Sequence, residues 1–382
     1  MEQRFFRDRR HVMIVLGSNE LRADVFDRDL CIGCGACVSL CPYFKSYNGK
    51  TAMLFPCTRP QGRCFAYCPK VEVNLDEVSR YVFGADYSPD PLGRYRFIKI
   101  SRAGSRAAPG NVQAGGTVSS LMIYALEKKR IDAAVLTGSK GLLPVPVIVT
   151  DPAAVRRYGS SKYAAAPVCE AFNQAVNEGY ERIGVVATPC QALALAQLRR
   201  NPLGEEGFID RAALAVGLFC TWSLDYREFK KFIAGRVDIS AVKKCDIPPP
   251  PAEIMEIHTD DGRVEIPLGE LRKLIPLSCD YCIDMTAEFA DVSVGVLEGR
   301  ADMNTLIIRT ERGQDLIDGA VEEGYIEVDD IPDESLEHLL TAAGNKKRRA
   351  LKKAFDEGMI NTGGAGRRSY LRIDGAILDK MV

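Results

Sequence analysis

The chain has 382 residues, of which 46% are hydrophobic and 26% charged, with a formal net charge of −1. This near-neutral balance gives no reason to expect nucleic acid or an acidic membrane surface as a partner, and no apolar run approaches the roughly 18 residues that span a bilayer. Thirteen cysteines without a recognisable secretion signal indicate metal ligation in a reducing cytoplasm rather than a disulfide framework. We therefore expect a cytoplasmic protein with more than one domain.

The first chemical motif follows a short N-terminal extension, which is expected over residues 1–24. Residues 31–42 spell C-x2-C-x2-C-x3-C-P, the run that wraps a [4Fe–4S] cluster in bacterial-type ferredoxins. Its cysteines are Cys31, Cys34, Cys37 and Cys41. Three thiolates on one tight loop reach one cluster, Gly33 and Gly35 allow the close turn, and the fourth cysteine points to a second cluster.

A second cysteine group, Cys57, Cys64 and Cys68, completes an iron–sulfur module that is expected over residues 25–80. By the rule for two-cluster ferredoxins, the first cluster receives Cys31, Cys34, Cys37 and Cys68. The second receives only Cys41, Cys57 and Cys64, because Leu54 stands where its fourth cysteine is expected. The second site is therefore a [3Fe–4S] cluster, a [4Fe–4S] cluster with a non-cysteine ligand, or absent. Zinc is disfavoured, because the first loop crowds together more thiolates than a zinc site uses.

Residues 81–110 contain many glycines and prolines, and they predict a linker with one strand over 95–100. From residue 111, short apolar runs rich in branched residues predict strands covered on both faces, with helical periodicity between them. The strands are expected at 133–137, 145–149, 183–187, 213–218, 292–296 and 305–308, and the helices at 118–129, 169–179, 190–200, 225–234 and 312–323. A hairpin is expected over 254–267, turning at Asp260-Asp261-Gly262.

The expected fold is mixed α/β, or α+β overall, with a small two-cluster ferredoxin-like domain before a larger α/β domain over residues 111–382. From about residue 334 the tail of the larger domain is predicted to be a charged helix. Its run Lys346-Lys347-Arg348-Arg349 is predicted to be a solvated face of that helix. Residues 362–368 are predicted to be irregular.

Four of the cysteines outside the ferredoxin-like module have a setting that suggests ligation. Cys190 and Cys220 each follow a predicted strand, while Cys279 and Cys282 form a C-x2-C pair. Ligands gather at the carboxyl ends of strands in α/β sheets, so convergence of these thiols on a third cluster is one interpretation. Spacing alone leaves the alternative of free buried thiols, because cysteine is also a common buried apolar residue. Cys169 and Cys245 lack such a setting, and we assign both to packing.

A polar loop over residues 111–120 opens the first predicted helix of the larger domain. Its paired glycines, Gly115 and Gly116, expose backbone N–H groups at a helix N-terminus, which favours an anion such as a flavin pyrophosphate. The alternative is an ordinary helix start capped by Thr117 or Ser119. The loop is not G-x-G-x-x-G, so an NAD site is disfavoured. A second polar loop offers a cation and a ring to a phosphate or a flavin, or is a plain surface loop: Ser161, Lys162 and Tyr163.

These motifs, in this order, resemble the coenzyme F420 hydrogenase/dehydrogenase beta-subunit family. The resemblance covers roughly residues 85–310, together with the ferredoxin module that many members carry in front. The stretches that carry it are 115–121, 161–163, 187–191, 217–220, 279–284 and 288–295. Several short motifs in the right order make the resemblance specific at the level of the family.

The resemblance implies an FAD and a [4Fe–4S] cluster held by Cys190, Cys220, Cys279 and Cys282. It also implies a flavin site, for which the candidate residues are Gly115, Gly116, Thr117, Val118, Ser119, Ser161, Lys162, Tyr163, Thr188 and Asp284. The implied function is a flavin and iron–sulfur oxidoreductase subunit. It would pass electrons between a hydride carrier, with coenzyme F420 favoured, and a partner of the hydrogenase, formate dehydrogenase or heterodisulfide-reductase type. The alternatives are a non-catalytic electron-relay adaptor and a reductase of another organic substrate.

Overall fold

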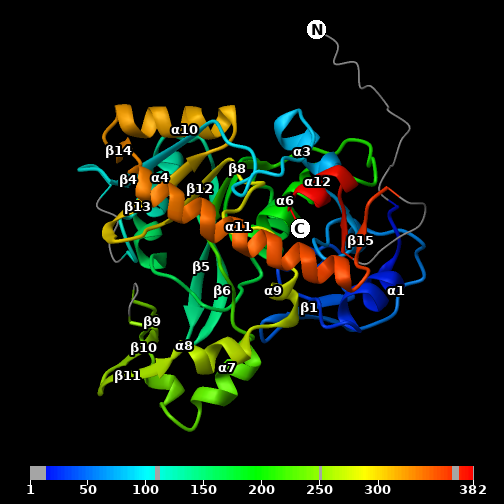
Figure 1. The fold of residues 1–382 in the computed structure, drawn as a ribbon, viewed down its shortest axis with the longest axis horizontal. Coiled ribbons are helices and arrows are strands. Elements are labelled where there is room, and N and C mark those ends of the chain that lie inside the picture. The colour runs from blue at the N-terminus through cyan, green and yellow to red at the C-terminus, as the bar shows by residue number, and fades with distance from the viewer. Residues whose placement is uncertain (1–13, 108–111, 249–251, 364–369, 382) are drawn as a thin grey trace.

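The computed structural model describes residues 14–107, 112–248, 252–363 and 370–381. Most of the expected N-terminal extension and of the segment 362–368 lies outside these ranges. A mixed sheet of eight strands forms the centre of the larger domain, in the order β14-β4-β13-β12-β8-β7-β5-β6 (Figure 1). The mixed α/β fold predicted from the sequence is confirmed. No helix in the described ranges is both long and apolar enough to cross a membrane.

The middle of this sheet is parallel, and its two edges are antiparallel. Strands β12, β8, β7 and β5 run parallel, while each pair toward the edges, β12–β13, β13–β4, β4–β14 and β5–β6, is antiparallel. The bounds are β4 Phe97–Ala103, β5 Ala133–Lys140, β6 Leu143–Val149, β7 Ile183–Ala187, β8 Ala212–Leu218, β12 Val292–Leu297, β13 Arg300–Ile308 and β14 Ile326–Asp330. Each of the seven expected strands is present. Only β14 was not predicted, because its sequence IEVDD is largely polar and exposed.

Helices cover both faces of the sheet. Helices α4 (Thr117–Glu127) and α10 (Glu311–Glu322) pack against each other and on one face, while α5 (Val168–Asn177) and α6 (Pro189–Arg199) cover the other. The start of α6 is set locally: Thr188 and Gln191 form a capping box, and Pro189 occupies the first turn. This cap fixes Cys190 in the first turn of the helix.

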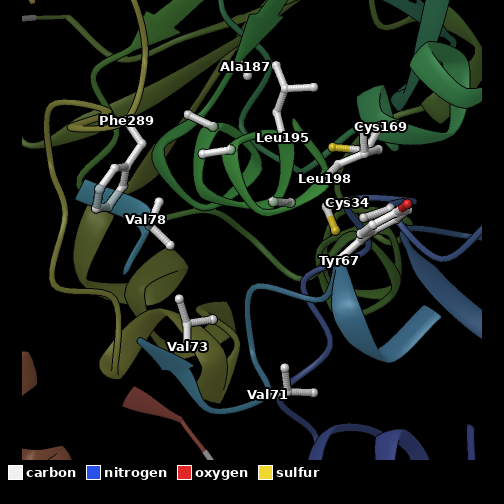
Figure 2. Packing of buried hydrophobic residues seen from close by; sticks show 14 of the residues in the cluster. Cys34, Tyr67, Val71, Val73, Val78, Cys169, Ala187, Leu195, Leu198 and Phe289 are labelled. Carbon is white, nitrogen blue, oxygen red and sulfur yellow. The ribbon is translucent and has the colours of Figure 1, made fainter. Parts of the chain in front are cut away.

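The ferredoxin-like module packs on the same side as α5 and α6. It contains the hairpin β1 (Phe44–Tyr47) and β2 (Lys50–Met53), which was not predicted, and the helices α1 Ser18–Leu21, α2 Arg63–Ala66 and α3 Leu75–Phe83. One continuous apolar core joins module residues such as Tyr67 and Val78 to Leu195 and Leu198 of α6 (Figure 2). The C-terminal segment joins it too, because β15 (Ile360–Asn361), β16 (Leu371–Arg372) and β3 (Val73–Asn74) form one small sheet, followed by α12 (Gly375–Met381).

A separate small core lies at the far end of the larger domain. It consists of α7 (Tyr226–Ile233), β9 (Lys244–Asp246), β10 (Ile254–Thr259), β11 (Gly262–Pro267) and α8 (Leu268–Leu271). The predicted hairpin is confirmed, because β10 pairs with β11 from Ile254↔Pro267 to Thr259↔Gly262. Its turn consists of Asp260 and Asp261.

The long helix α11 (Asp333–Asp356) runs across the molecule from the sheet toward the ferredoxin-like module (Figure 1). The prediction that its basic run is a solvated face is wrong for two of the four residues, since Lys346 and Lys347 are buried whereas Arg348 and Arg349 are exposed. The two lysines lie on the stripe of small buried residues Ala343, Ala350 and Ala354. Helical spacing therefore turns them inward.

Candidate iron–sulfur and flavin sites

The first cysteine set surrounds one cavity. Cys31, Cys34, Cys37 and Cys68 all line a cavity of about 20 Å³ in the ferredoxin-like module. The loop needs glycine at residue 33, where φ is +65° and a Cβ would lie 2.1 Å from the Gly49 carbonyl oxygen. Burial raises the pKa of Cys37 well above its usual range, and the neighbouring thiols of this set raise it further. Metal ligands must be thiolates, so four such thiols around one cavity fit a bound cluster.

The larger domain covers this loop through α5. The backbone N–H of Cys169 donates to the Cys34 carbonyl over 3.0 Å, and Asn173 Nδ2 donates to the Val38 carbonyl over 2.8 Å. A Cβ at Gly35 would lie 2.8 Å from the Glu170 nitrogen. Cys169, assigned to packing from the sequence, is buried, and its hydrogen bond to the Cys34 thiol raises the pKa of Cys34. The first cluster site is therefore closed by residues of both domains.

The second ferredoxin-type site gathers its three cysteines. Burial raises the pKa of Cys64 to about 11, and charge repulsion from Cys41 and Cys57 adds to this shift. Cys41 is exposed, and so is Leu54, the residue found where a fourth cysteine was expected. The nuclearity of this site stays a prediction.

The third cysteine set also comes together. Cys190 lies in the first turn of α6, Cys220 follows β8, and Cys279 and Cys282 lie in and after the short helix α9 (Leu277–Asp280). Burial raises the pKa of Cys190 to about 12, with the charges of Cys282 and Cys279 adding to the shift. Burial likewise raises the pKa of Cys220, and the other three thiols raise it further. The four half-buried cysteines are therefore electrostatic neighbours at the carboxyl ends of the parallel strands.

The spacing of the thiols differs from that of a single-ion site. Within the described ranges, no group of three or more His, Cys, Asp or Glu residues is arranged to hold a metal ion. A tetrahedral zinc ion, with Zn–S bonds of about 2.3 Å, would bring its thiolates within roughly 3.8 Å of one another. The ligands of an iron–sulfur cluster bind different irons, so thiols that are neighbours without this single-ion spacing suit a cluster.

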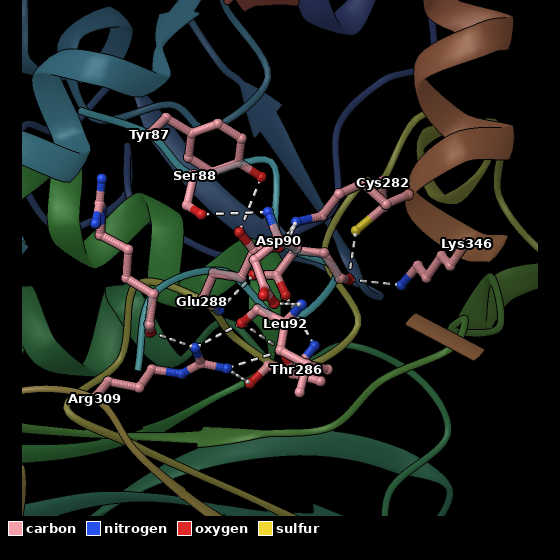
Figure 3. Close-up of polar contacts among 12 residues, drawn as sticks. Tyr87, Ser88, Asp90, Leu92, Cys282, Thr286, Glu288, Arg309 and Lys346 are labelled. Atoms are coloured by element: carbon pink, nitrogen blue, oxygen red, sulfur yellow. Dashed lines mark hydrogen bonds and ion pairs between the residues drawn. The ribbon is translucent and has the colours of Figure 1, made fainter. Parts of the chain in front are cut away.

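Thr188 and Asp284, both predicted as flavin contacts, lie at this third cysteine site. Thr188 Oγ1 is 3.5 Å from the Cys190 sulfur. The backbone carbonyl of Asp284 accepts a hydrogen bond from the Cys282 thiol over 3.4 Å. Its carboxylate accepts hydrogen bonds from the backbone N–H groups of Thr286 and Glu288 over 2.9 and 2.8 Å. Asp284 therefore folds the loop that carries Cys282. Figure 3 shows Cys282 on this loop and Lys346 reaching it from α11.

The glycine loop begins α4 without a side-chain cap. Gly116 is the N-cap residue at φ +80°, so the predicted alternative of capping by Thr117 or Ser119 is wrong. Thr117 is buried, its hydroxyl lies 2.9 Å from Ser101 Oγ, and its N–H donates to Asn304 Oδ1 over 3.2 Å. Val118 and Ser119 are half-buried at the start of the helix. The contribution of Asn304 was missed, because this residue comes from a strand nearly 190 positions later.

The second polar loop lies beside the glycine loop. Ser161 N–H donates over 3.3 Å to Gln113 Oε1, and the Gln113 amide also bonds to Asp246 of β9. Tyr163 Oη accepts the Ile247 N–H over 2.9 Å. The structure thus brings both predicted loops together with β9, which the sequence did not predict. Cys245, also assigned to packing, lies in β9, where burial raises its pKa to about 11 and Lys162 acts against this shift.

A buried ion pair lies next to the third cysteine set. Glu288 lines a cavity of about 20 Å³ together with Cys190 and Cys282. Its carboxylate lies 2.8 Å from Lys347 Nζ and accepts the Tyr87 hydroxyl over 2.9 Å (Figure 3). Burial raises the pKa of Glu288 to about 7, and the Lys347 ammonium acts against this shift.

This pKa predicts a pH-dependent stability. The folded chain holds the Glu288 proton more tightly than the unfolded chain does. The contribution of this proton to the free energy of unfolding is therefore complete below about pH 4.5 and is lost as pH rises through about 7. The wild type is expected to lose about 2 kcal/mol relative to Glu288→Gln between pH 5.5 and 7. Thermal unfolding of both proteins across this range measures the difference. The exposed Glu334→Gln is the control, and a Glu288→Gln difference independent of pH would contradict the prediction.

Comparisons with known proteins bear on these sites. Models of the coenzyme F420 hydrogenase/dehydrogenase beta subunit match residues 102–173 with their N-terminal part and 180–334 with their C-terminal part. A 4Fe-4S binding domain matches residues 24–43. These matches include the glycine loop, the Ser161–Tyr163 loop, all four cysteines of the third set and the first cysteine motif.

Individual relatives agree with these models. The coenzyme F420 hydrogenase subunit beta of Methanothermobacter thermautotrophicus is 30% identical over 268 residues, which are 68% of this chain and 94% of the relative. The coenzyme F420-dependent sulfite reductase of Methanocaldococcus jannaschii is 29% identical over 77% of this chain, but the chain spans only 46% of that protein. A chain of the F420-reducing [NiFe] hydrogenase complex from Methanosarcina barkeri superposes with a TM-score of 0.64 at 25% identity, covering 70% of this chain and 93% of that one.

Proposed function

Since this chain belongs to the coenzyme F420 hydrogenase/dehydrogenase beta-subunit family, we propose that it passes electrons between a hydride carrier and a partner oxidoreductase. Coenzyme F420 is the carrier we favour, because the relatives are named for it. The observation that carries the proposal is the convergence of four half-buried cysteines, Cys190, Cys220, Cys279 and Cys282, at the carboxyl ends of the parallel strands. The chemistry of this donor set fits a [4Fe–4S] cluster.

We place FAD at the glycine loop and the adjoining Ser161–Tyr163 loop. FAD, when bound, accepts a hydride and passes on its electrons singly. The N-terminus of α4 presents backbone N–H groups that favour the pyrophosphate. Burial lowers the pKa of Lys162, so its ammonium would gain from an anionic ligand. Tyr163 lies next to the cysteine site as well, because its carbonyl accepts the Leu224 N–H over 2.7 Å, four residues beyond Cys220.

The route from this site leads into the ferredoxin-like module. The cavity that Cys190 and Cys282 line and the cavity of Cys31, Cys34, Cys37 and Cys68 share the lining residues Pro69 and Lys70. Beyond the first ferredoxin-type site, we propose that the second site lies at the surface, because Cys41 is exposed. A partner of the hydrogenase, formate dehydrogenase or heterodisulfide-reductase type would exchange electrons there.

The proposal predicts that reduced coenzyme F420 bleaches the flavin absorbance of the anaerobically purified protein, whereas NADH does so more slowly or not at all. Stopped-flow absorbance with each donor measures this, and the same protein stripped of flavin is the control. If neither donor bleached the flavin while a redox partner reduced the clusters rapidly, the chain would be a relay adaptor without its own substrate.

A further inference from the structure

We propose that two buried lysines, Lys70 and Lys346, set the reduction potential of the cluster held by Cys190, Cys220, Cys279 and Cys282. We further propose that Lys70 also acts on the neighbouring ferredoxin-type cluster of Cys31, Cys34, Cys37 and Cys68. The inference rests on the proposed function, because it requires the third cluster. Neither lysine falls within residues 24–43, 102–173 or 180–334, which the family models match.

Lys346 reaches the third cysteine set from α11. Its side chain is only 5% exposed, and Nζ donates to the carbonyls of Cys220 over 2.7 Å and Asp284 over 2.8 Å. Both acceptors are neutral carbonyl groups, so these hydrogen bonds fix the ammonium without pairing its charge, although the Asp284 carboxylate also acts on it electrostatically. Burial acts to lower the pKa of Lys346, but the charges of Cys282 and Cys220 outweigh it and raise the pKa. The neighbouring Lys347 differs, because its charge is already paired with Glu288.

Lys70 reaches the same set from the ferredoxin-like module. It is 2% exposed, Nζ donates to the Ser278 carbonyl over 2.9 Å, and the ammonium lies 4.6 Å from the centre of the Tyr370 ring. Ser278 directly precedes the ligand Cys279, and the charge of Lys70 acts to lower the pKa of Cys279 and Cys190. The side chain thus lies against the third cysteine set.

The backbone of Lys70 belongs to the other cluster site. It follows the ligand Cys68 by two residues, and its N–H bonds to the Cys68 sulfur and acts to lower the pKa of that thiol. Lys70 also lines both cavities. One residue therefore joins the two sites, with its N–H on a sulfur of the first and its ammonium beside the third.

A fixed positive charge favours the reduced form of a thiolate-ligated cluster, because each added electron increases the negative charge of the site. This effect is strong in a buried site, where water screens charges poorly. Removing Lys346 should therefore lower the reduction potential of one cluster. Removing the Lys70 ammonium should lower that of the third cluster and, because Lys70 also lines the first cavity, that of the first cluster, while the backbone N–H on Cys68 stays in place.

Potentiometric titration followed by electron paramagnetic resonance tests this in the full-length, anaerobically purified protein. At the wild-type midpoint, Lys346→Met should reduce the ratio of reduced to oxidised third cluster about tenfold, or about 59 mV for one electron, and Lys346→Arg should restore most of it. Lys70→Met should shift two signals. Lys352→Met, on the exposed face of α11, is the matched control and should shift none.

Wild-type potentials in Lys346→Met and Lys70→Met, at full iron content, would overturn the inference and leave the proposed function standing. A wild-type protein whose iron content and paramagnetic resonance signals are unchanged when Cys282 is replaced by serine holds no third cluster, and that result would instead overturn the proposed function. If Lys346→Met lost its cluster, Lys70→Met would decide the question, because it removes a charge that comes from a different segment.

Discussion

Replacing Cys282 with serine is expected to remove one cluster, about four irons per chain, while the ferredoxin-type centres stay in place. Cys282 lies on the loop that Asp284 folds, and it meets thiols from α6, from the end of β8 and from α9. A serine hydroxyl is a poor replacement for a thiolate at iron, because soft sulfur ligands select iron–sulfur clusters. Iron and sulfide analysis together with low-temperature paramagnetic resonance measures the loss.

Cys245→Ser is the matched control for this variant. Cys245 is also half-buried in the larger domain, but it lies in β9 beside Lys162 instead of in the third cysteine set. It should retain the full iron content. An unchanged iron content and spectrum in Cys282→Ser would contradict the ligand assignment.

Much of the fold follows from local sequence patterns. The branched apolar runs predicted seven strands of the central sheet because strands buried on both faces need them, as β7 shows with five buried residues. The C-x2-C-x2-C-x3-C spacing predicted a cysteine loop, and the structure places three of its members with Cys68 around one cavity. In Thr188-Pro189-Cys190-Gln191 the cap, the first turn and the cysteine lie within four residues, so the placement of Cys190 is local as well.

The remaining features depend on contacts between distant segments. Whether a lysine is buried depends on its partner, and Lys347 meets Glu288 almost sixty residues away. The run Lys346–Arg349 carries no sign of this except its register with Ala343 and Ala350, which was the signal available in the sequence. The small sheet of β3, β15 and β16 joins the ferredoxin-like module to the C-terminus. Two-residue strands of this kind carry no periodicity of their own.

Replacing Lys347 with methionine is expected to destabilise the folded protein by about 3–5 kcal/mol near pH 8, because it leaves a buried carboxylate without its counter-charge. Lys347 and Glu288 are only 1% and 2% exposed, so water screens the pair poorly. The substitution removes the Lys347 ammonium, whose charge lowers the pKa of Glu288, so the pKa of Glu288 rises further above about 7. At pH 5.5 the carboxyl group is protonated in either protein, and the destabilisation should be smaller there.

Thermal unfolding at pH 8 and pH 5.5 measures both effects, with Arg348→Met as the matched control. Arg348 is the next residue of α11 and is exposed, so its replacement should change stability by no more than about 0.5 kcal/mol. The double variant Lys347→Met with Glu288→Gln should recover part of the loss, because it removes the unpaired charge as well. Equal stability of Lys347→Met and Arg348→Met at pH 8 would show that the buried pair does not hold α11 against the cysteine site.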